Sequence, residues 1–174
     1  MPSSPYYQEA RKLGVLLAKK GYTMVTGGGP GIMEAANRGA FEGGGESVGL
    51  NIQLPIEQRT NRYVKKGIGF HYFFTRKVML SASAQAYVFF PGGFGTMDEM
   101  TEMVTLRQTG KIPGTVPVIL YGKKFWEPFL AWVRTSMCDE QRFVEKEEMG
   151  IIHLVDSPEE ALKIIETTSE RAFG

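Results

Sequence analysis

The chain has 174 residues, of which 43% are hydrophobic and 22% are charged, a composition typical of one globular domain with a sizeable core. Its formal net charge of +1 provides no basic surface, so nucleic acid is not a favoured partner. The absence of any apolar run of about 18 residues gives no reason to expect a membrane partner. The single cysteine, Cys138, excludes an internal disulfide and favours a reducing compartment. We expect one soluble, cytoplasmic domain over residues 1–174.

Helical and strand-like segments alternate along the first half of the chain. Apolar spacing predicts a helix over Tyr6–Lys20 that stops at Gly21. Later helices are predicted over residues 32–41 and from Thr75, as its cap, to about Ser83. The predicted strands are "YTMVT" (22–26), "ESVGLNI" (46–52) and "FHYFF" (70–74), with a polar loop at 53–67 before the last of them.

The second half continues the alternation with more strongly apolar strands. Strands are predicted at 85–90, 116–122 and 151–155, and helices at 96–108, 125–137 and 158–168. Near-continuous apolar strands separated by helices are typical of a parallel sheet that is covered on both faces. The predicted fold is therefore α/β, with a Rossmann-like, doubly wound and mostly parallel sheet.

Two glycine clusters lie where predicted strands end and helices begin. "TGGGPG" (26–31) includes Gly28, Gly29 and Gly31, and "PGGFG" (91–95) includes Gly92, Gly93 and Gly95. Loops at the carboxyl ends of parallel strands bind ligands in such folds, and the helix N-terminus that follows favours an anion. Neither loop has the G-x-G-x-x-G or the P-loop pattern, so a monophosphate fits better than a dinucleotide or nucleoside triphosphate.

Neither a metal nor a cofactor is expected. His71 and His153 are the only histidines, and neither has metal-ligand spacing with an acid or with Cys138. Plain packing is the favoured interpretation of both.

Three motifs together resemble the LOG family, often labelled "lysine decarboxylase-like". They are "GGGPGIMEAANRGA" (27–40), "RKVML" (76–80) and "PGGFGTMDE" (91–99), and the similarity extends from about Ser4 to Ile165. "LPIEQRTN" (54–61) is similar to the family branch with an EQ-x-x-N loop. The resemblance implies a cytokinin riboside 5′-monophosphate or AMP phosphoribohydrolase, typically a dimer or hexamer. Family members usually begin with one further strand, which this sequence lacks ahead of its first helix.

The resemblance also implies site residues. It places Arg76 and Glu99 in catalytic roles, and Lys77, Gly92, Gly93, Gly95 and Thr96 around the phosphate and ribose. These residue types suit the chemistry, because a carboxylate can stabilise an oxocarbenium-like ribose and a guanidinium fork can bind phosphate or steady the leaving base.

Simpler roles stay open for several of these residues. Thr96 and Glu99 form T-x-x-E, so Glu99 could belong to a helix capping box. Asp98 could be a helix-dipole acid, and Glu102 could face the ligand pocket or solvent. Arg76 and Lys77 could be a solvated helix start, although two cations there oppose the helix dipole and favour an anionic partner. Glu34 and Asn37 are weaker site candidates.

Three functions are compared. The leading hypothesis is an N-glycosidase acting on adenine-type nucleoside 5′-monophosphates, and the alternative is a non-catalytic protein that binds a nucleotide or phosphate ligand. A pyridoxal phosphate decarboxylase is disfavoured, since the motifs supply no evident Schiff-base lysine. A homo-oligomer is expected, with a contact that includes the helix at 96–108 through Met97, Met100 and Val104.

Overall fold

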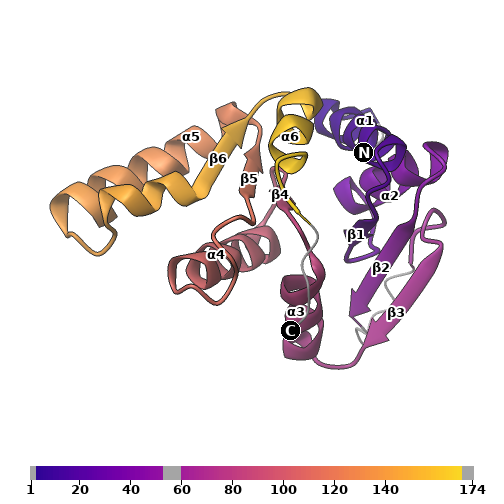
Figure 1. The fold of residues 1–174 in the computed structure, drawn as a ribbon, viewed down its shortest axis with the longest axis horizontal. Helices are drawn as coiled ribbons and strands as arrows, with labels where there is room; N and C mark the ends of the chain where they lie inside the picture. The colour runs from indigo at the N-terminus through magenta and orange to yellow at the C-terminus, as the bar shows by residue number, and fades with distance from the viewer. Residues whose placement is uncertain (1–2, 53–59, 170–174) are drawn as a thin grey trace. The chain divides into compact units, whose positions relative to one another are not determined.

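The computed structural model describes residues 3–52 and 60–169, which divide into two compact units, Met1–Ala84 and Gln85–Gly174 (Figure 1). Each unit is an α/β structure built on its own three-stranded parallel sheet. The expected α/β class with parallel strands and flanking helices is confirmed. The described strands pair as two sheets of three, and the first described element is a helix rather than a strand.

Unit 1 has a sheet with strand order β1-β2-β3. Thr26 pairs with Gly49 at the end of β1, and Ile52 pairs with Phe70 at the end of β2. Because all three strands are parallel, their carboxyl ends lie at one edge of this sheet. The elements are α1 (Pro5–Lys19), β1 (Met24–Thr26), α2 (Ile32–Glu42), β2 (Ser47–Ile52), β3 (Lys66–Phe70) and α3 (Phe73–Ser83).

Helices α1 and α2 pack closely because small residues face each other. A Cβ on Gly14 would lie 2.5 Å from the carbonyl oxygen of Ala36, and a Cβ on Gly39 would clash with the carbonyl oxygen of Arg11. Ala35 and Ala40 on α2 are fully buried. The small residues of "EAANRGA" therefore serve helix–helix packing, and this packing fixes the helix that follows the first glycine loop.

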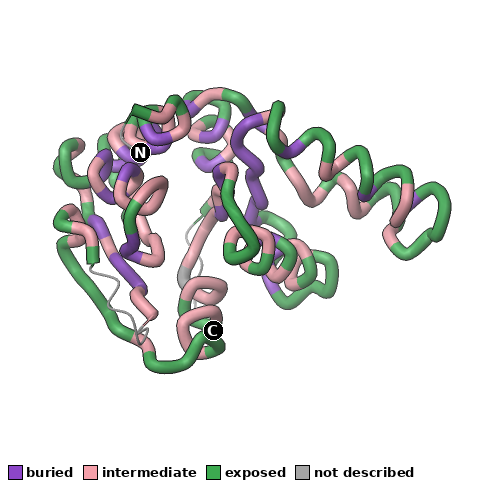
Figure 2. The backbone as a smooth tube through the Cα atoms, turned by 180° about the vertical axis from the view of Figure 1, so that it is seen from behind, coloured by how far each residue is buried: buried purple, intermediate pink, exposed green. Residues whose placement is uncertain are grey.

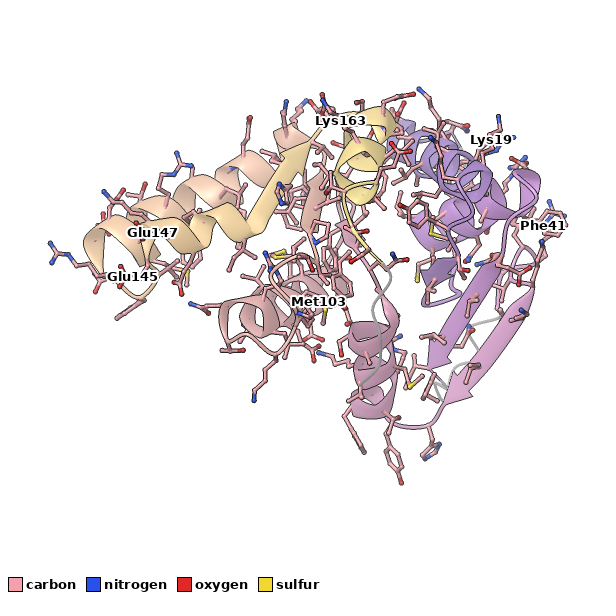
Figure 3. All side chains as sticks on the ribbon, viewed as in Figure 1. Lys19, Phe41, Met103, Glu145, Glu147 and Lys163 are labelled. Carbon is pink, nitrogen blue, oxygen red and sulfur yellow. The ribbon has the colours of Figure 1, made fainter. Side chains whose placement is uncertain are left out.

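Unit 2 has a sheet with strand order β4-β5-β6, and all four residues of β5 are buried (Figure 2). Met100, Leu120 and Trp126 form its core cluster, and Met103, labelled in Figure 3, is only 2% exposed. The elements are β4 (Tyr87–Phe89), α4 (Phe94–Gln108), β5 (Val118–Tyr121), α5 (Lys123–Trp132), the π-helical η1 (Val133–Glu140), the 3₁₀ helix η2 (Lys146–Ile151), β6 (Ile152–Val155) and α6 (Pro158–Ile165).

Several local predictions are wrong. Strand β3 begins at Lys66, inside the predicted polar loop, and ends where the strand "FHYFF" was predicted to begin. Helix α3 begins at Phe73, so Thr75 lies inside it and donates its hydroxyl to the Tyr72 carbonyl at 2.8 Å instead of capping it. The helix of α5 continues through η1 to Glu140, beyond its predicted end. The 3₁₀ helix η2 was not predicted; Figure 3 labels Glu145, its N-cap, and Glu147, which lies in it.

Candidate active site

The first glycine loop joins β1 to α2 at the carboxyl edge of the unit 1 sheet. Gly28 and Gly31 have φ angles of 72° and 74°, in the left-handed region that favours glycine. Gly28 also has no room for a side chain, because its Cβ would lie 2.5 Å from Oδ1 of Asn51. Both Gly28 and Gly29 are buried. The loop is therefore held in one backbone shape by its own sequence and by its neighbours.

A buried polar network lies behind this loop. The Thr26 hydroxyl donates to Oδ1 of Asn37 at 2.7 Å and accepts from the Gly28 N–H at 2.9 Å. Asn37, which is 0% exposed, donates through Nδ2 to the Ser47 hydroxyl at 2.9 Å. Buried polar groups persist where they are hydrogen-bonded, and such networks favour one conformation. The network thus joins β1, α2 and β2 to the loop.

Arg76 and Lys77 lie on the first two turns of α3, and both are half-buried. The structure brings Arg76 to the first glycine loop: its Nη1 atom lies 3.7 Å from the position that a Cβ of Gly27 would occupy. Its guanidinium carbon also lies 5.3 Å from the centre of the Phe73 ring, within cation–π range. A permanent positive charge is therefore placed beside the loop that was predicted to bind phosphate.

Glu34 lies in the first turn of α2, directly after the loop. Its Oε1 atom accepts a hydrogen bond from the hydroxyl of Tyr7, a residue of α1, at 3.0 Å. Burial is the main cause of a raised pKa at Tyr7, so this hydroxyl stays protonated as a donor at neutral pH. The contact fixes one oxygen of a carboxylate beside the loop.

The second glycine loop joins β4 to α4 in unit 2. Gly93 is the N-cap of α4 in an extended conformation, and the helix begins at Phe94. The first free N–H groups of the helix therefore come from the motif "FGT" itself, which is the arrangement that favours an anion. A Cβ on Gly92 would clash with the Thr96 side chain, whereas Gly93 and Gly95 have no described atom within 4 Å of the Cβ position.

The early start of α4 decides the role of two neighbouring residues. Thr96 is the third residue of the helix and not its N-cap, and the cap has no side-chain hydrogen bond. The capping-box interpretation of Thr96 and Glu99 is therefore wrong. The first turn of α4 contains no acid, so Asp98 is not the helix-dipole acid that was considered. A glycine can occupy an N-cap, which allows the helix to begin at Phe94, two residues before Thr96.

Glu99 and Glu102 lie on α4 one turn apart, and both side chains are half-buried. Phe94, at the helix start, is 95% exposed. The apolar residues of this helix point elsewhere: Met100 belongs to the core cluster, and Met97 and Val104 pack against it. These residues, which motivated the prediction of a subunit contact, are thus used inside unit 2.

The predicted site residues divide between the two units. Arg76 and Lys77 share unit 1 with the first loop, including Gly28, Gly29 and Gly31; Glu99 and Glu102 share unit 2 with the second loop, including Gly92, Gly93, Gly95 and Thr96. Asn51 and Asn61 are neighbours of the first loop that were not predicted from the sequence. Asn61 belongs to the EQ-x-x-N pattern, which was its only local signal; Glu57 and Gln58 of that pattern lie outside the described residues.

Across residues 3–52 and 60–169, no group of three or more His, Cys, Asp or Glu side chains could hold a metal ion. No helix in that part of the chain is both long enough and apolar enough to cross a membrane.

Comparison with known proteins gives a consistent family match. The sequence model described as "possible lysine decarboxylase" matches residues 33–165. The chain is 29% identical to the cytokinin riboside 5′-monophosphate phosphoribohydrolase LOG of Oryza sativa subsp. japonica, over 97% of this chain and 70% of that relative. It is 27% identical to the phosphoribohydrolase LOG1 of Arabidopsis thaliana, over 92% of this chain and 75% of that relative.

Solved structures share the fold. A molybdenum cofactor binding protein from Rippkaea orientalis matches with a TM-score of 0.69 and 22% identity, over 94% of this chain and 88% of that one. The structural genomics target TM1055 matches with a TM-score of 0.64 and 28% identity, over 95% of this chain and 91% of that one. One fold thus serves proteins that are described in different functional terms.

Proposed function

Because the chain belongs to the LOG family, whose sequence model is described as "possible lysine decarboxylase", we propose that it hydrolyses the N-glycosidic bond of adenine-type nucleoside 5′-monophosphates. The substrate is AMP or a cytokinin riboside monophosphate. Water adds to C1′ of the ribose, the bond from C1′ to the base breaks, and the base leaves with a proton. The products are the free base and ribose 5-phosphate.

The observation that carries this proposal is the position of Arg76 beside the first glycine loop. Its Nη1 atom lies 3.7 Å from the Cβ position of Gly27, at the edge of the sheet where a helix N-terminus also begins. A guanidinium and unpaired backbone N–H groups attract the same kind of ligand, an anion with several acceptor oxygens. We assign Arg76, with Lys77 and the glycines at 28, 29 and 31, to the phosphate or to the leaving base.

We assign Glu99 to the cleavage of the N-glycosidic bond. Breaking the N-glycosidic bond develops positive charge on the ribose, and a nearby carboxylate stabilises that charge and aligns the attacking water. The structure supports this assignment by removing the competing one, since Glu99 lies beyond the first turn of α4 and does not cap it. In this proposal ribose and phosphate are bound by Gly92, Gly93, Gly95 and Thr96. Glu102 is assigned to the same ligand.

Binding without turnover is the second candidate. The fold is shared with proteins described as molybdenum cofactor binding or carrier proteins, at 22% and 21% identity. In that case the two glycine loops would hold a phosphate-bearing ligand, and Glu99 would have no chemical role. The two functions differ in one observable, the release of free base.

Assembly and location are part of the proposal. We infer a homo-oligomer, a dimer or a hexamer, and a cytoplasmic protein that forms one nucleotide-binding domain over residues 1–174. The free thiol of Cys138 is buried and is compatible with a reducing compartment. Light scattering at micromolar concentration tests the assembly, and a monomer there would contradict it.

The function is tested by incubating the purified chain separately with AMP and with isopentenyladenosine monophosphate, followed by chromatography. Release of free base from at least one of them is the expected result. If both ligands bind and neither releases base, the hydrolase is ruled out and the binding protein is favoured. Incubation with lysine and pyridoxal phosphate tests the decarboxylase, which would show a visible Schiff-base absorbance.

A further inference from the structure

Asn61 holds the first glycine loop from outside the loop. Its Nδ2 atom donates to the carbonyl oxygens of Gly28 and Gly29, each at 3.1 Å, and to Oδ1 of Asn37 at 2.9 Å. Its backbone N–H donates to the same Gly28 carbonyl at 2.8 Å. The residue is distant in sequence, 33 positions from Gly28, so this contact exists only in the folded unit.

The other polar atoms of Asn61 are also used. Its Oδ1 atom accepts the Tyr63 N–H at 3.2 Å, which fixes the orientation of the side-chain amide. The Asn37 oxygen that it reaches also accepts the Thr26 hydroxyl, and Asn37 is fully buried. Asn61 is therefore connected to the loop on one side and to the buried network of α2 and the sheet on the other.

These bonds set the direction of the loop amides. All described peptide bonds are trans, so the N–H of Gly29 points away from the carbonyl of Gly28 and thus away from Asn61. The next residue, Pro30, has no N–H. The Gly29 carbonyl can therefore face Asn61 without changing the direction of another backbone N–H. The loop keeps its carbonyls toward the protein, and this leaves the Gly29 donor on the opposite side.

We propose that Asn61 is a positioning residue for phosphate: it holds the carbonyls of Gly28 and Gly29 back so that the loop presents the Gly29 N–H, and not a carbonyl oxygen, to the substrate. This inference rests on the proposed function, since the phosphate is that of the nucleoside monophosphate. Asn61 itself does not contact the ligand. A loop released from Asn61 can turn a carbonyl oxygen toward the phosphate, which repels it.

The test uses Asn61→Asp, which matches the native side chain in size but places a carboxylate oxygen against three acceptor oxygens. Titration calorimetry of the whole chain with ribose 5-phosphate, a product that cannot react further, measures binding without turnover. We expect the affinity to fall by about tenfold or more at pH 8, the equivalent of roughly one lost hydrogen bond to a charged group. Asn61→Ala, which removes the donor without adding charge, keeps the test valid should the Asp variant not fold.

Measuring the affinity of the Asp variant at lower pH distinguishes a positioning role of Asn61 from a simple loss of packing. Three acceptor oxygens around this position disfavour a carboxylate and raise the pKa of the Asp carboxyl above its ordinary value of about 3.9. The protonated carboxyl donates a hydrogen bond again, so the affinity of the variant relative to the parent should recover as the pH falls from 8 to 5. Dividing by the parent at each pH removes the titration of the phosphate itself. Arg62→Gln, an exposed neighbour, is the matched control and should bind like the parent.

Each outcome decides between the two proposals. Asp and Ala variants that bind ribose 5-phosphate within about twofold of the parent would overturn the role of Asn61 and leave the proposed function intact. A deficit of the Asp variant that is the same at every pH would also overturn it. A parent that binds ribose 5-phosphate but releases base from neither AMP nor isopentenyladenosine monophosphate would rule out the hydrolase and keep the positioning role. A parent that does not bind ribose 5-phosphate would overturn both.

Discussion

Glu99 is the residue at which local sequence and structure point to different roles. The T-x-x-E spacing is a common capping signal, and on sequence alone it competes with a catalytic carboxylate. Because Gly93 takes the N-cap of α4, the cap interpretation no longer applies. Glu99 is half-buried on the helix that follows the second glycine loop, and its assignment to a ribosyl cation remains a prediction.

The first prediction is that Glu99→Gln removes activity without removing the fold. Glutamine keeps the shape and helix propensity of the side chain but not its charge. Loss of one well-placed electrostatic group should lower kcat by roughly 10² to 10³. AMP binding and the urea unfolding midpoint should stay near those of the parent, as measured by steady-state kinetics, calorimetry and denaturation.

Asp98→Asn is the matched control, because it removes the same charge one residue earlier on an exposed part of α4. We expect its kcat to stay within about fivefold of the parent, since an exposed side-chain charge contributes at most about 1 kcal/mol. An active Glu99→Gln variant, or equal losses in both variants, would refute the catalytic role.

The residues around the first loop show how far sequence reasoning reaches. The role of Arg76 was implied by the resemblance of the glycine motifs and the "RK" pair to the LOG family, because these motifs are short patterns that one sequence displays. Asn51 carries no local pattern, and the EQ-x-x-N pattern of Asn61 does not reveal its partner. Their contacts with Gly28 depend on how β2 and the segment from residue 60 return to the loop. Contacts of this kind are set by tertiary structure, and a single sequence does not display them.

At the scale of elements, the seam between α1 and α2 has a clear steric requirement. The second prediction is that Gly39→Ala destabilises the protein by about 1–3 kcal/mol, because a Cβ there meets the Arg11 backbone and overpacks the seam. Alanine's better helix propensity, about 1 kcal/mol, offsets only part of this. Urea denaturation measures the change.

Gly150→Ala serves as the control for that prediction. No described atom lies within 4 Å of the Cβ position of Gly150, and its backbone does not require glycine. Its unfolding free energy should match the parent within about 0.5 kcal/mol. Equal stability of the Gly39→Ala variant would show that the two helices can separate at no cost.

The same two helices are joined by Glu42, which accepts from Nε of Arg11 at 2.6 Å and of Arg38 at 2.8 Å. The hydrogen bond from Arg11 is the main reason that the pKa of Glu42 lies below its usual value. A lowered folded-state pKa stabilises the fold above the unfolded-state pKa of about 4.3, and this contribution is lost as pH falls through the folded-state value.

The third prediction follows from that sign. Glu42→Gln should lower the unfolding free energy by about 0.5–1 kcal/mol at pH 7, a modest amount because the pair is partly exposed. The difference from the parent should shrink as the pH is lowered below about 4.3. Urea denaturation across this pH range, with the exposed Glu127→Gln as control, measures it. A pH-independent difference would contradict the ionic origin.

The predicted boundaries of β3 and α3 are wrong because pairing with strands distant in sequence overrides local secondary-structure propensity. The segment Lys66–Phe70 contains two glycines, so its sequence gives no strand signal, and most of its residues are exposed in the structure. Its pairing with β2, from Val48 opposite Lys66 to Ile52 opposite Phe70, makes it a strand. The aromatic run that follows favours a strand by propensity, yet Phe73 begins a helix, because tertiary context outweighs β-propensity.

At the scale of the whole molecule, the α/β class was predictable because apolar strands and amphipathic helices alternate throughout. The division into two units, each with a three-stranded sheet, was not, since strand pairing depends on partners distant in sequence. Each unit repeats one arrangement, a glycine loop between a strand end and a helix start. We interpret this repetition as two anion-binding elements, which agrees with the proposed phosphate-bearing substrate.

The most direct measurement of the central claim compares AMP with adenosine as substrates of the purified chain. Two charge-assisted hydrogen bonds to the phosphate, at about 1.5 kcal/mol each, correspond to roughly 10²-fold in kcat/KM. We predict that adenine and ribose 5-phosphate form in equal amounts from AMP, and that adenosine is cleaved at least about 10²-fold less efficiently. Equal turnover of AMP and adenosine would contradict the account, and so would the absence of free base from both AMP and isopentenyladenosine monophosphate.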